Sequence, residues 1–259
     1  MHMNEIKKFY EINDDENLAY SQAFAKKNKK KSPGVVFLSG LKSDMEGTKA
    51  IFLHNWALKQ GRDFIRYDYR GHGLSSGKYE ETSLSEWLED TTNIIMNLTE
   101  GPQILVGSSL GGWLSLLFAE RYSEKVAGII GIAAAPDFTE QYTEENLSKN
   151  QKEEIKQTGK LSFNSEYFDE PLTITKKLID DGNENLVLNK NININCPIRL
   201  FQGSEDADVP ISVSLRIMEK IQSKNVKLTL VKDIDHRFST NECLELIKEA
   251  IEELTLANY

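Results

Sequence analysis

ILVGSSLGGW, residues 104–113, is the stretch that decides the fold of this chain. An apolar run ends at Gly107 and an apolar helix pattern follows the last glycine, so the stretch predicts a strand, a sharp turn and a helix. Ser109 has glycine two positions before and two positions after it, where side chains would crowd the turn. Ser108 has larger residues at both of those positions. The spacing therefore selects Ser109 as the serine of a G-x-S-x-G motif.

The turn of such a motif has a chemical consequence. Its serine is held in a strained backbone conformation, with the hydroxyl clear of both the strand and the helix. Backbone amides that open the helix point toward the same place, where they can stabilise an oxyanion. We therefore predict that Ser109 is a nucleophile. The alternative is a flexible strand-to-helix loop without chemistry.

Composition limits the classes of function. The 259 residues are 39% hydrophobic and 27% charged, as in globular proteins, and no apolar run approaches the ~18 residues of a membrane span. The net charge of −9 disfavours nucleic acid as a partner. Two cysteines make no disulfide framework, and no Cys/His group has metal-ligand spacing. We expect a cytoplasmic protein without cofactor, metal or stable membrane insertion, and the sequence leaves its oligomeric state open.

Strand and helix patterns alternate along the rest of the chain. Continuous apolar runs predict strands that are buried on both faces, and a 3.6-residue period predicts amphipathic helices. The alternation predicts an α/β protein: one domain, residues 1–259, with a mostly parallel, doubly wound sheet flanked by helices. The expected strands are residues 8–12, 18–21 (a hairpin with the first), 35–38, 64–68, 104–106, 126–134, 196–202 and 226–231, and the expected helices are 50–57, 85–98, 113–118, 211–222 and one from about 241.

A polar, acidic stretch from about 136 to 193 interrupts this alternation. It is too long for a simple connection and predicts a helical cap inserted over the site, with short helices at 141–157 and 172–180. Its apolar residues either line a substrate pocket or form the cap's own small core. They are Phe138, Tyr142, Leu147, Phe163, Tyr167 and Phe168.

A serine nucleophile needs a histidine to take its proton, and the histidine needs a carboxylate to orient it. Where the motif forms a strand-to-helix turn in an α/β sheet, the chain order is serine, acid, histidine. His236 is the only histidine that follows Ser109, so we predict that it is the base. His72 lies within a glycine-rich turn after a strand, and we expect it to hydrogen-bond its own loop.

The acid has several candidates. Asp206 lies just past the end of a predicted strand, where ligand chemistry collects in α/β sheets, and is favoured. Asp208 is close to Pro210 and is expected to cap the following helix. Glu205 beside it and Asp137 after the preceding strand stay open as alternatives.

With these residues placed, the chain resembles the α/β-hydrolase superfamily over nearly its whole length. More narrowly, residues 101–113 and 195–200 resemble the abhydrolase-domain palmitoyl-protein thioesterases, which are also called mycophenolic acid acyl-glucuronide esterases. The animal members of that family are mitochondrial, whereas this chain lacks an Arg-rich, acid-poor presequence, which favours the cytoplasm. The motifs that carry the superfamily resemblance are YDYRGHGLS (67–75), GSSLGG (107–112), GSEDADVP (203–210) and DHRF (235–238).

The resemblance implies a Ser109–Asp206–His236 triad and an oxyanion hole made by the backbone amides of Leu41 and Leu110. The chain has Ser39-Gly40 where the superfamily commonly has His-Gly before the first of these amides. The implied activity is hydrolysis of carboxylic esters or thioesters, on a small-molecule or acylated-protein substrate, through an acyl-enzyme. The alternatives are a lipase or peptidase of the same fold, or a scaffold that binds ligands without catalysis.

Overall fold

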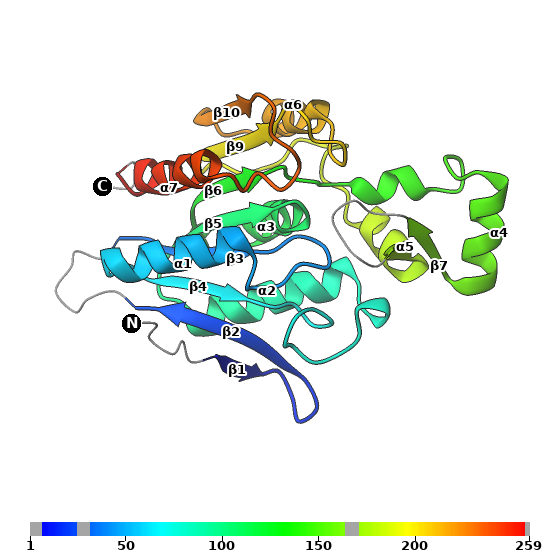
Figure 1. Cartoon of the computed structure of the whole chain (residues 1–259), viewed down its shortest axis with the longest axis horizontal. Coiled ribbons are helices and arrows are strands. Elements are labelled where there is room, and N and C mark those ends of the chain that lie inside the picture. Colours follow the sequence, from blue (N-terminus) through cyan, green and yellow to red (C-terminus); the bar gives the residue numbers. More distant parts are fainter. Residues whose placement is uncertain (1–6, 25–31, 164–170, 257–259) are drawn as a thin grey trace.

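An eight-stranded sheet runs through the centre of this computed structural model, which describes residues 7–24, 32–163 and 171–256 (Figure 1). The strand order is β1-β2-β4-β3-β5-β6-β9-β10. Apart from the antiparallel pairs β1–β2 and β2–β4, neighbouring strands are parallel. The strands are β1 (Lys8–Glu11), β2 (Asn17–Ala23), β3 (Gly34–Leu38), β4 (Phe64–Tyr67), β5 (Gln103–Ser108), β6 (Val126–Ile132), β9 (Ile198–Gly203) and β10 (Val226–Val231).

Helices cover both faces of the sheet and divide its core in two. In β3, Val35 and Phe37 face the side of α1 and α7, whereas Val36 and Leu38 face the side of α2 and α3. Both faces of this strand are therefore buried from solvent, which is why its sequence is continuously apolar rather than alternating. The covering helices are α1 (Thr48–Gln60), α2 (Leu84–Leu98), α3 (Leu110–Arg121), α6 (Ile211–Lys220) and α7 (Asn241–Leu256).

The carboxyl ends of the parallel strands meet at one edge of the sheet, and the inserted segment lies on that side (Figure 1). This segment joins β6 to β9. It contains the short 3-10 helix η3 (Phe138–Tyr142), α4 (Lys149–Thr158), β7 (Lys160–Phe163), β8 (Leu172–Thr175) and α5 (Lys176–Glu184). We call residues 136–193 the cap.

The sequence-based prediction of the cap was partly wrong. Residues 172–175 form a strand paired antiparallel with β7, and the helix expected from 172 begins at Lys176. The helix expected over 141–157 is confined to α4, which Ser148 caps by accepting the amide of Gln151. The cap is therefore built from helices and a small sheet.

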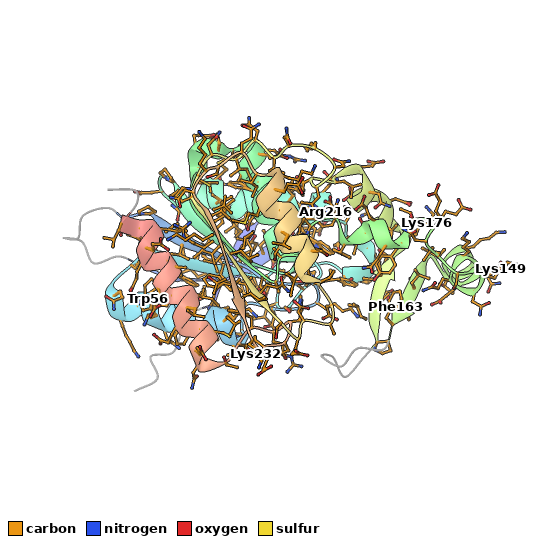
Figure 2. The ribbon with its side chains drawn as sticks, turned by 90° about the horizontal axis from the view of Figure 1, so that it is seen from above. Trp56, Lys149, Phe163, Lys176, Arg216 and Lys232 are labelled. Carbon is orange, nitrogen blue, oxygen red and sulfur yellow. The ribbon has the colours of Figure 1, made fainter. Side chains whose placement is uncertain are left out.

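Apolar residues of the cap pack on each other and on the body. Phe138 meets the ring of Trp113 from α3 edge-on at 5.6 Å, and Tyr142 lies 5.4 Å from Phe163. Leu147 is 9% exposed and belongs to the part of the core on the side of α2 and α3. Tyr167 and Phe168 lie outside the described residues. Figure 2 shows Phe163 and Lys149 on the cap side of the molecule, far from Trp56 on α1. These contacts join the cap residues to each other and to the body, and both a separate cap core and the lining of a pocket stay predictions.

Candidate active site

Ser109 occupies the turn between β5 and α3. Its backbone has φ 53° and ψ −114°, a conformation that residues with a Cβ rarely adopt. The Ser109 amide donates to the carbonyl of Ile132 at 2.9 Å, which ties the turn to the neighbouring strand β6. Ser108 instead is the last residue of β5 and is buried. The strained position of the motif therefore belongs to Ser109.

Steric crowding explains the glycines around this turn. A Cβ on Gly107 would clash with the Gly111 carbonyl, and a Cβ on Gly111 would clash with the Leu38 carbonyl at the end of β3. A Cβ on Gly112 would lie 2.5 Å from the Cβ of Ala134. The first turn of α3 can approach β3 and β6 this closely only without those side chains.

A second loop lies beside Ser109. A Cβ built on Gly40 would be 3.4 Å from the Cβ of Ser109, and the turn continues to Ser43, whose amide donates to the Gly40 carbonyl at 3.1 Å. Among the described residues, neither the Leu41 nor the Leu110 amide donates a hydrogen bond to the protein. Two backbone donors next to a strained serine are the arrangement that an oxyanion hole requires.

Asp206 and His236 meet after the ends of β9 and β10. The Nδ1 atom of His236 lies 3.0 and 2.9 Å from the two carboxylate oxygens of Asp206. The Asp206 side chain is 1% exposed and that of His236 is 17% exposed. A carboxylate only accepts hydrogen bonds, so this contact places the ring proton on Nδ1 and leaves Nε2 as the basic nitrogen.

Further donors orient the Asp206 carboxylate. Its oxygens accept from the side-chain amide of Gln202 at 2.6 Å and from the backbone amide of Val209 at 2.8 Å. Gln202 is itself buried and accepts from the Ser214 hydroxyl at 2.9 Å. Neither Gln202 nor Ser214 was predicted from the sequence. The available signal for Gln202 was its polar side chain near the carboxyl end of a mostly apolar strand.

The rival acids have other surroundings. Glu205 is exposed and accepts a hydrogen bond from the neighbouring Ser204 hydroxyl at 3.4 Å. The N-cap residue of α6 is Pro210, so Asp208 lies two residues before the position at which it was expected to cap the helix. Asp137 accepts the amides of Val187 and Leu188 at 2.8 and 2.7 Å, and burial raises its pKa. Asp137 therefore fastens the chain that returns from the cap.

His72 is buried behind the Gly40–Ser43 turn. Its Nδ1 faces the Arg70 carbonyl at 3.3 Å, which is the contact with its own loop expected from the sequence. Its Nε2 also accepts the Lys42 amide at 3.1 Å, which the sequence did not predict. Burial lowers the pKa of His72 to about 4, so the ring is neutral at physiological pH.

The chain is similar to known hydrolases in sequence and in structure. Residues 29–172 match the model of a family described as serine aminopeptidase, S33. The chain is 39% identical over 240 residues to the mitochondrial palmitoyl-protein thioesterase ABHD10 of Homo sapiens, covering 92% of this chain and 76% of the relative.

Two solved structures support the same assignment. The alpha/beta hydrolase domain-containing protein 10 from mouse superposes with a TM-score of 0.86 at 35% identity, covering 96% of this chain and 98% of that one. A hydrolase from Agrobacterium vitis superposes with a TM-score of 0.89 at 33% identity, covering 97% and 98%. These similarities confirm the α/β-hydrolase fold and the family resemblance predicted from the sequence.

Proposed function

The chain belongs to the α/β-hydrolase family described as serine aminopeptidase, S33, and from that membership we propose that it is a serine hydrolase that cleaves carboxylic esters or thioesters through an acyl-enzyme. The observation that carries the proposal is the buried Asp206 carboxylate on Nδ1 of His236, at the same sheet edge as the strained Ser109. We propose these three residues as the catalytic triad.

The chemistry proceeds in two halves. The Ser109 hydroxyl oxygen attacks the acyl carbonyl carbon, His236 Nε2 takes its proton, and the carbonyl electrons move onto the oxygen. The Leu41 and Leu110 amides donate to that oxyanion, and each such donor is worth ~10²-fold or more in rate. Collapse of the intermediate expels the thiol or alcohol, which His236 protonates. Water, deprotonated by His236, then releases the acid and restores the Ser109 hydroxyl.

The relatives suggest the substrate class. Proteins 37–39% identical to this chain are named palmitoyl-protein thioesterases, so we propose acyl thioesters and esters, free or on a protein, as substrates. We propose further that residues 1–259 form one catalytic domain and that the cap at 136–193 selects the acyl group. The description of the matching family favours peptide bonds as a second candidate.

A substrate series separates these candidates. We expect the enzyme to hydrolyse p-nitrophenyl esters and acyl thioesters of increasing chain length faster than amino-acid p-nitroanilides. Ser109→Ala should lose this activity and its labelling by a fluorophosphonate probe, while its circular dichroism stays that of the wild type. Equal labelling of the variant and the wild type would refute Ser109 as the nucleophile.

Three carboxylates weighed as the acid provide a matched test. Asp206→Asn should lower kcat by ~10³-fold or more, because the amide favours the wrong His236 tautomer. Glu205→Gln should leave kcat unchanged. Asp137→Asn should lower thermal stability far more than kcat, because it loses an acceptor for the Val187 and Leu188 amides.

Location is a separate part of the proposal. No helix among the described residues is long and apolar enough to cross a membrane. The animal relatives carry the word mitochondrial in their names. The cytoplasm stays our prediction for this chain, and fractionation of the source cells, with immunodetection in the cytosolic and membrane fractions, tests it.

A further inference from the structure

The hydrogen-bond partners of His72 determine which of its ring nitrogens carries the proton. Nε2 faces the backbone amide of Lys42, which can only donate, so Nε2 must offer its lone pair. Nδ1 faces the Arg70 carbonyl, which can only accept, so Nδ1 must carry the proton. A neutral ring in this tautomer satisfies both contacts, and the ring is 5% exposed.

Aromatic neighbours hold the His72 ring in place. Tyr69 and Tyr79 meet it edge-on at 5.5 Å, and Trp87 meets it edge-on at 5.2 Å. The Arg70 carbonyl that anchors Nδ1 also accepts from the Trp87 indole at 3.1 Å. The imidazole therefore has little freedom to follow a moving partner.

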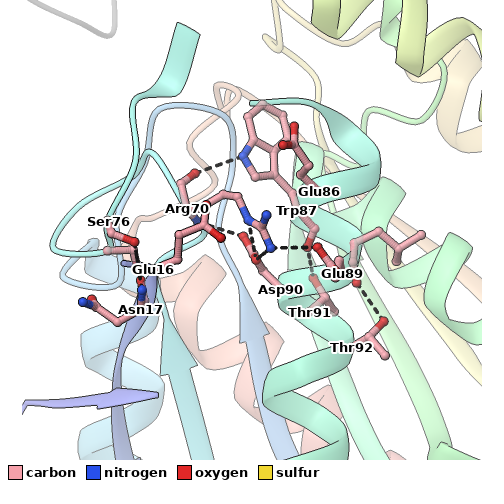
Figure 3. Close-up of polar contacts among 12 residues, drawn as sticks. Glu16, Asn17, Arg70, Ser76, Glu86, Trp87, Glu89, Asp90, Thr91 and Thr92 are labelled. Carbon is pink, nitrogen blue, oxygen red and sulfur yellow. Dashed lines mark hydrogen bonds and ion pairs between the residues drawn. The ribbon is translucent and has the colours of Figure 1, made fainter. Parts of the chain in front are cut away.

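Helix α2 fixes the residue that carries this carbonyl. The Asp90 carboxylate accepts hydrogen bonds from the backbone amide and from Nε of Arg70, each at 2.8 Å. Glu89 accepts a hydrogen bond from the same guanidinium (Figure 3). Asp90 is fully buried. A continuous set of contacts thus runs from α2 through Arg70 and His72 to the Lys42 amide.

The Lys42 amide lies in the turn that borders Ser109. Lys42 has φ 54°, a left-handed conformation that a lysine adopts at a cost of about 1 kcal/mol. The peptide that His72 holds directly follows Leu41, and the amide of Leu41 is left without a protein partner among the described residues. Fixing one peptide of so short a turn restricts the orientation of its neighbour.

We propose that His72 is a positioning residue for ester hydrolysis, which holds the Gly40–Ser43 turn through Nε2 so that the Leu41 amide faces the oxyanion. This inference rests on the proposed function. His72 touches neither substrate nor nucleophile in this scheme, and its effect is on how well the Leu41 donor is aimed. Displacing this donor by a fraction of an ångström weakens its hydrogen bond to the transition-state oxyanion more than it weakens binding of the substrate.

Two variants of similar length isolate the hydrogen bond. His72→Gln keeps an acceptor that can reach the Lys42 amide, whereas His72→Met has nearly the same shape without a strong acceptor. Both lose the same aromatic contacts. We expect kcat on a p-nitrophenyl ester to be ~10-fold or more lower in His72→Met than in His72→Gln, with KM within about twofold. The rate of fluorophosphonate labelling should fall in parallel.

Buried His54 on α1 provides the control. His54→Gln and His54→Met should have equal kcat, because the His54 ring packs edge-on on Phe64 at the amino end of β4, the end of the sheet opposite the site. Equal kcat for the two His72 variants, or a difference confined to KM, would overturn the inference. If Ser109→Ala also kept its activity, the proposed function would fail as well. A loss in Ser109→Ala together with equal His72 variants would remove this inference alone.

The unaltered protein offers an independent measurement, which does not depend on how the variants fold. Long-range ¹H–¹⁵N spectra should show His72 as a neutral ring protonated on Nδ1, unchanged between pH 8 and pH 6. A ring protonated on Nε2 would place two donors face to face at the Lys42 amide, and observing it would exclude the proposed role.

Discussion

At the scale of single residues, the backbone of Ser109 carries a conflict between function and stability. Its φ of 53° and ψ of −114° put a side chain into a region that favours glycine. The flanking glycines relieve the crowding around the turn but not the strain at Ser109 itself. The hydroxyl is presented to the site by a conformation that costs on the order of 1–3 kcal/mol.

Ser109→Gly should therefore be more stable than Ser109→Ala. Glycine removes the strain but loses about 0.5–1 kcal/mol through the entropy of the unfolded chain, so we expect a net gain of about 1 kcal/mol over alanine. Both variants should be inactive, which removes activity as a variable. Urea unfolding of the two proteins measures the difference. A glycine variant that is the less stable of the two would show that the turn is not strained.

The candidate site residues left signals of different strength in the sequence, for identifiable reasons. Spacing selected Ser109 and chain order selected His236, because the roles proposed for these residues depend on their side chains. Asp206 could be favoured over Glu205 only by its place after a strand. The contact from His72 to Lys42 left no signal, because its partner is a backbone amide that any residue other than proline would supply.

At the scale of elements, strands and helices of the body were predicted because their patterns are long or continuously apolar. β10 lies at Val226–Val231, the range predicted, and α2 begins one residue before its predicted start. The cap strands were missed because each has four residues and they are separated in sequence. Leu172–Thr175 leads directly into α5, so its apolar positions were assigned to one longer helix.

The ion pair between α2 and the loop after β4 is dominated by burial. Burial raises the pKa of Asp90 to about 6, although hydrogen bonds from Arg70 act in the opposite direction. The desolvation of the Asp90 carboxylate thus destabilises its charged form more than the interactions with Arg70 stabilise it. The pair specifies where the 69–75 loop lies more than it stabilises the fold.

The difference in free energy of unfolding between the wild type and Asp90→Asn should depend on pH. A carboxyl whose pKa rises from 3.8 to about 6 on folding contributes stability that is complete below pH 3.8 and is lost as the pH rises through 6. The stability of the wild type relative to Asp90→Asn should therefore decline between pH 4 and pH 6, by up to about 3 kcal/mol. Urea unfolding at several pH values measures it, and a difference that is constant over this range would contradict it.

At the scale of the whole molecule, the two ends of the strands have different tasks. The carboxyl ends of β5, β9 and β10 lead to Ser109, Asp206 and His236. Near the amino ends of β9 and β10, Arg199 and Lys227 both bind the Glu253 carboxylate on α7, at 2.9 and 2.5 Å. This clamp fastens the last helix to the strands that lead to the proposed acid and base, from the end of the sheet opposite the candidate site.

Glu253→Gln should lower stability without lowering kcat. Hydrogen bonds from Arg199 and Lys227 lower the pKa of Glu253 to about 2, so its contribution is present above the unfolded value of 4.5 and is lost as the pH falls toward 2. The side chain is 43% exposed and screened by solvent, which limits the loss to at most about 1 kcal/mol at pH 7. The difference in urea unfolding should shrink below pH 4.5, the opposite direction to that expected for Asp90→Asn. If kcat fell under conditions in which the variant is fully folded, the prediction would be wrong. The loss of the Glu253 contacts would then be transmitted along β9 and β10 to Asp206 and His236.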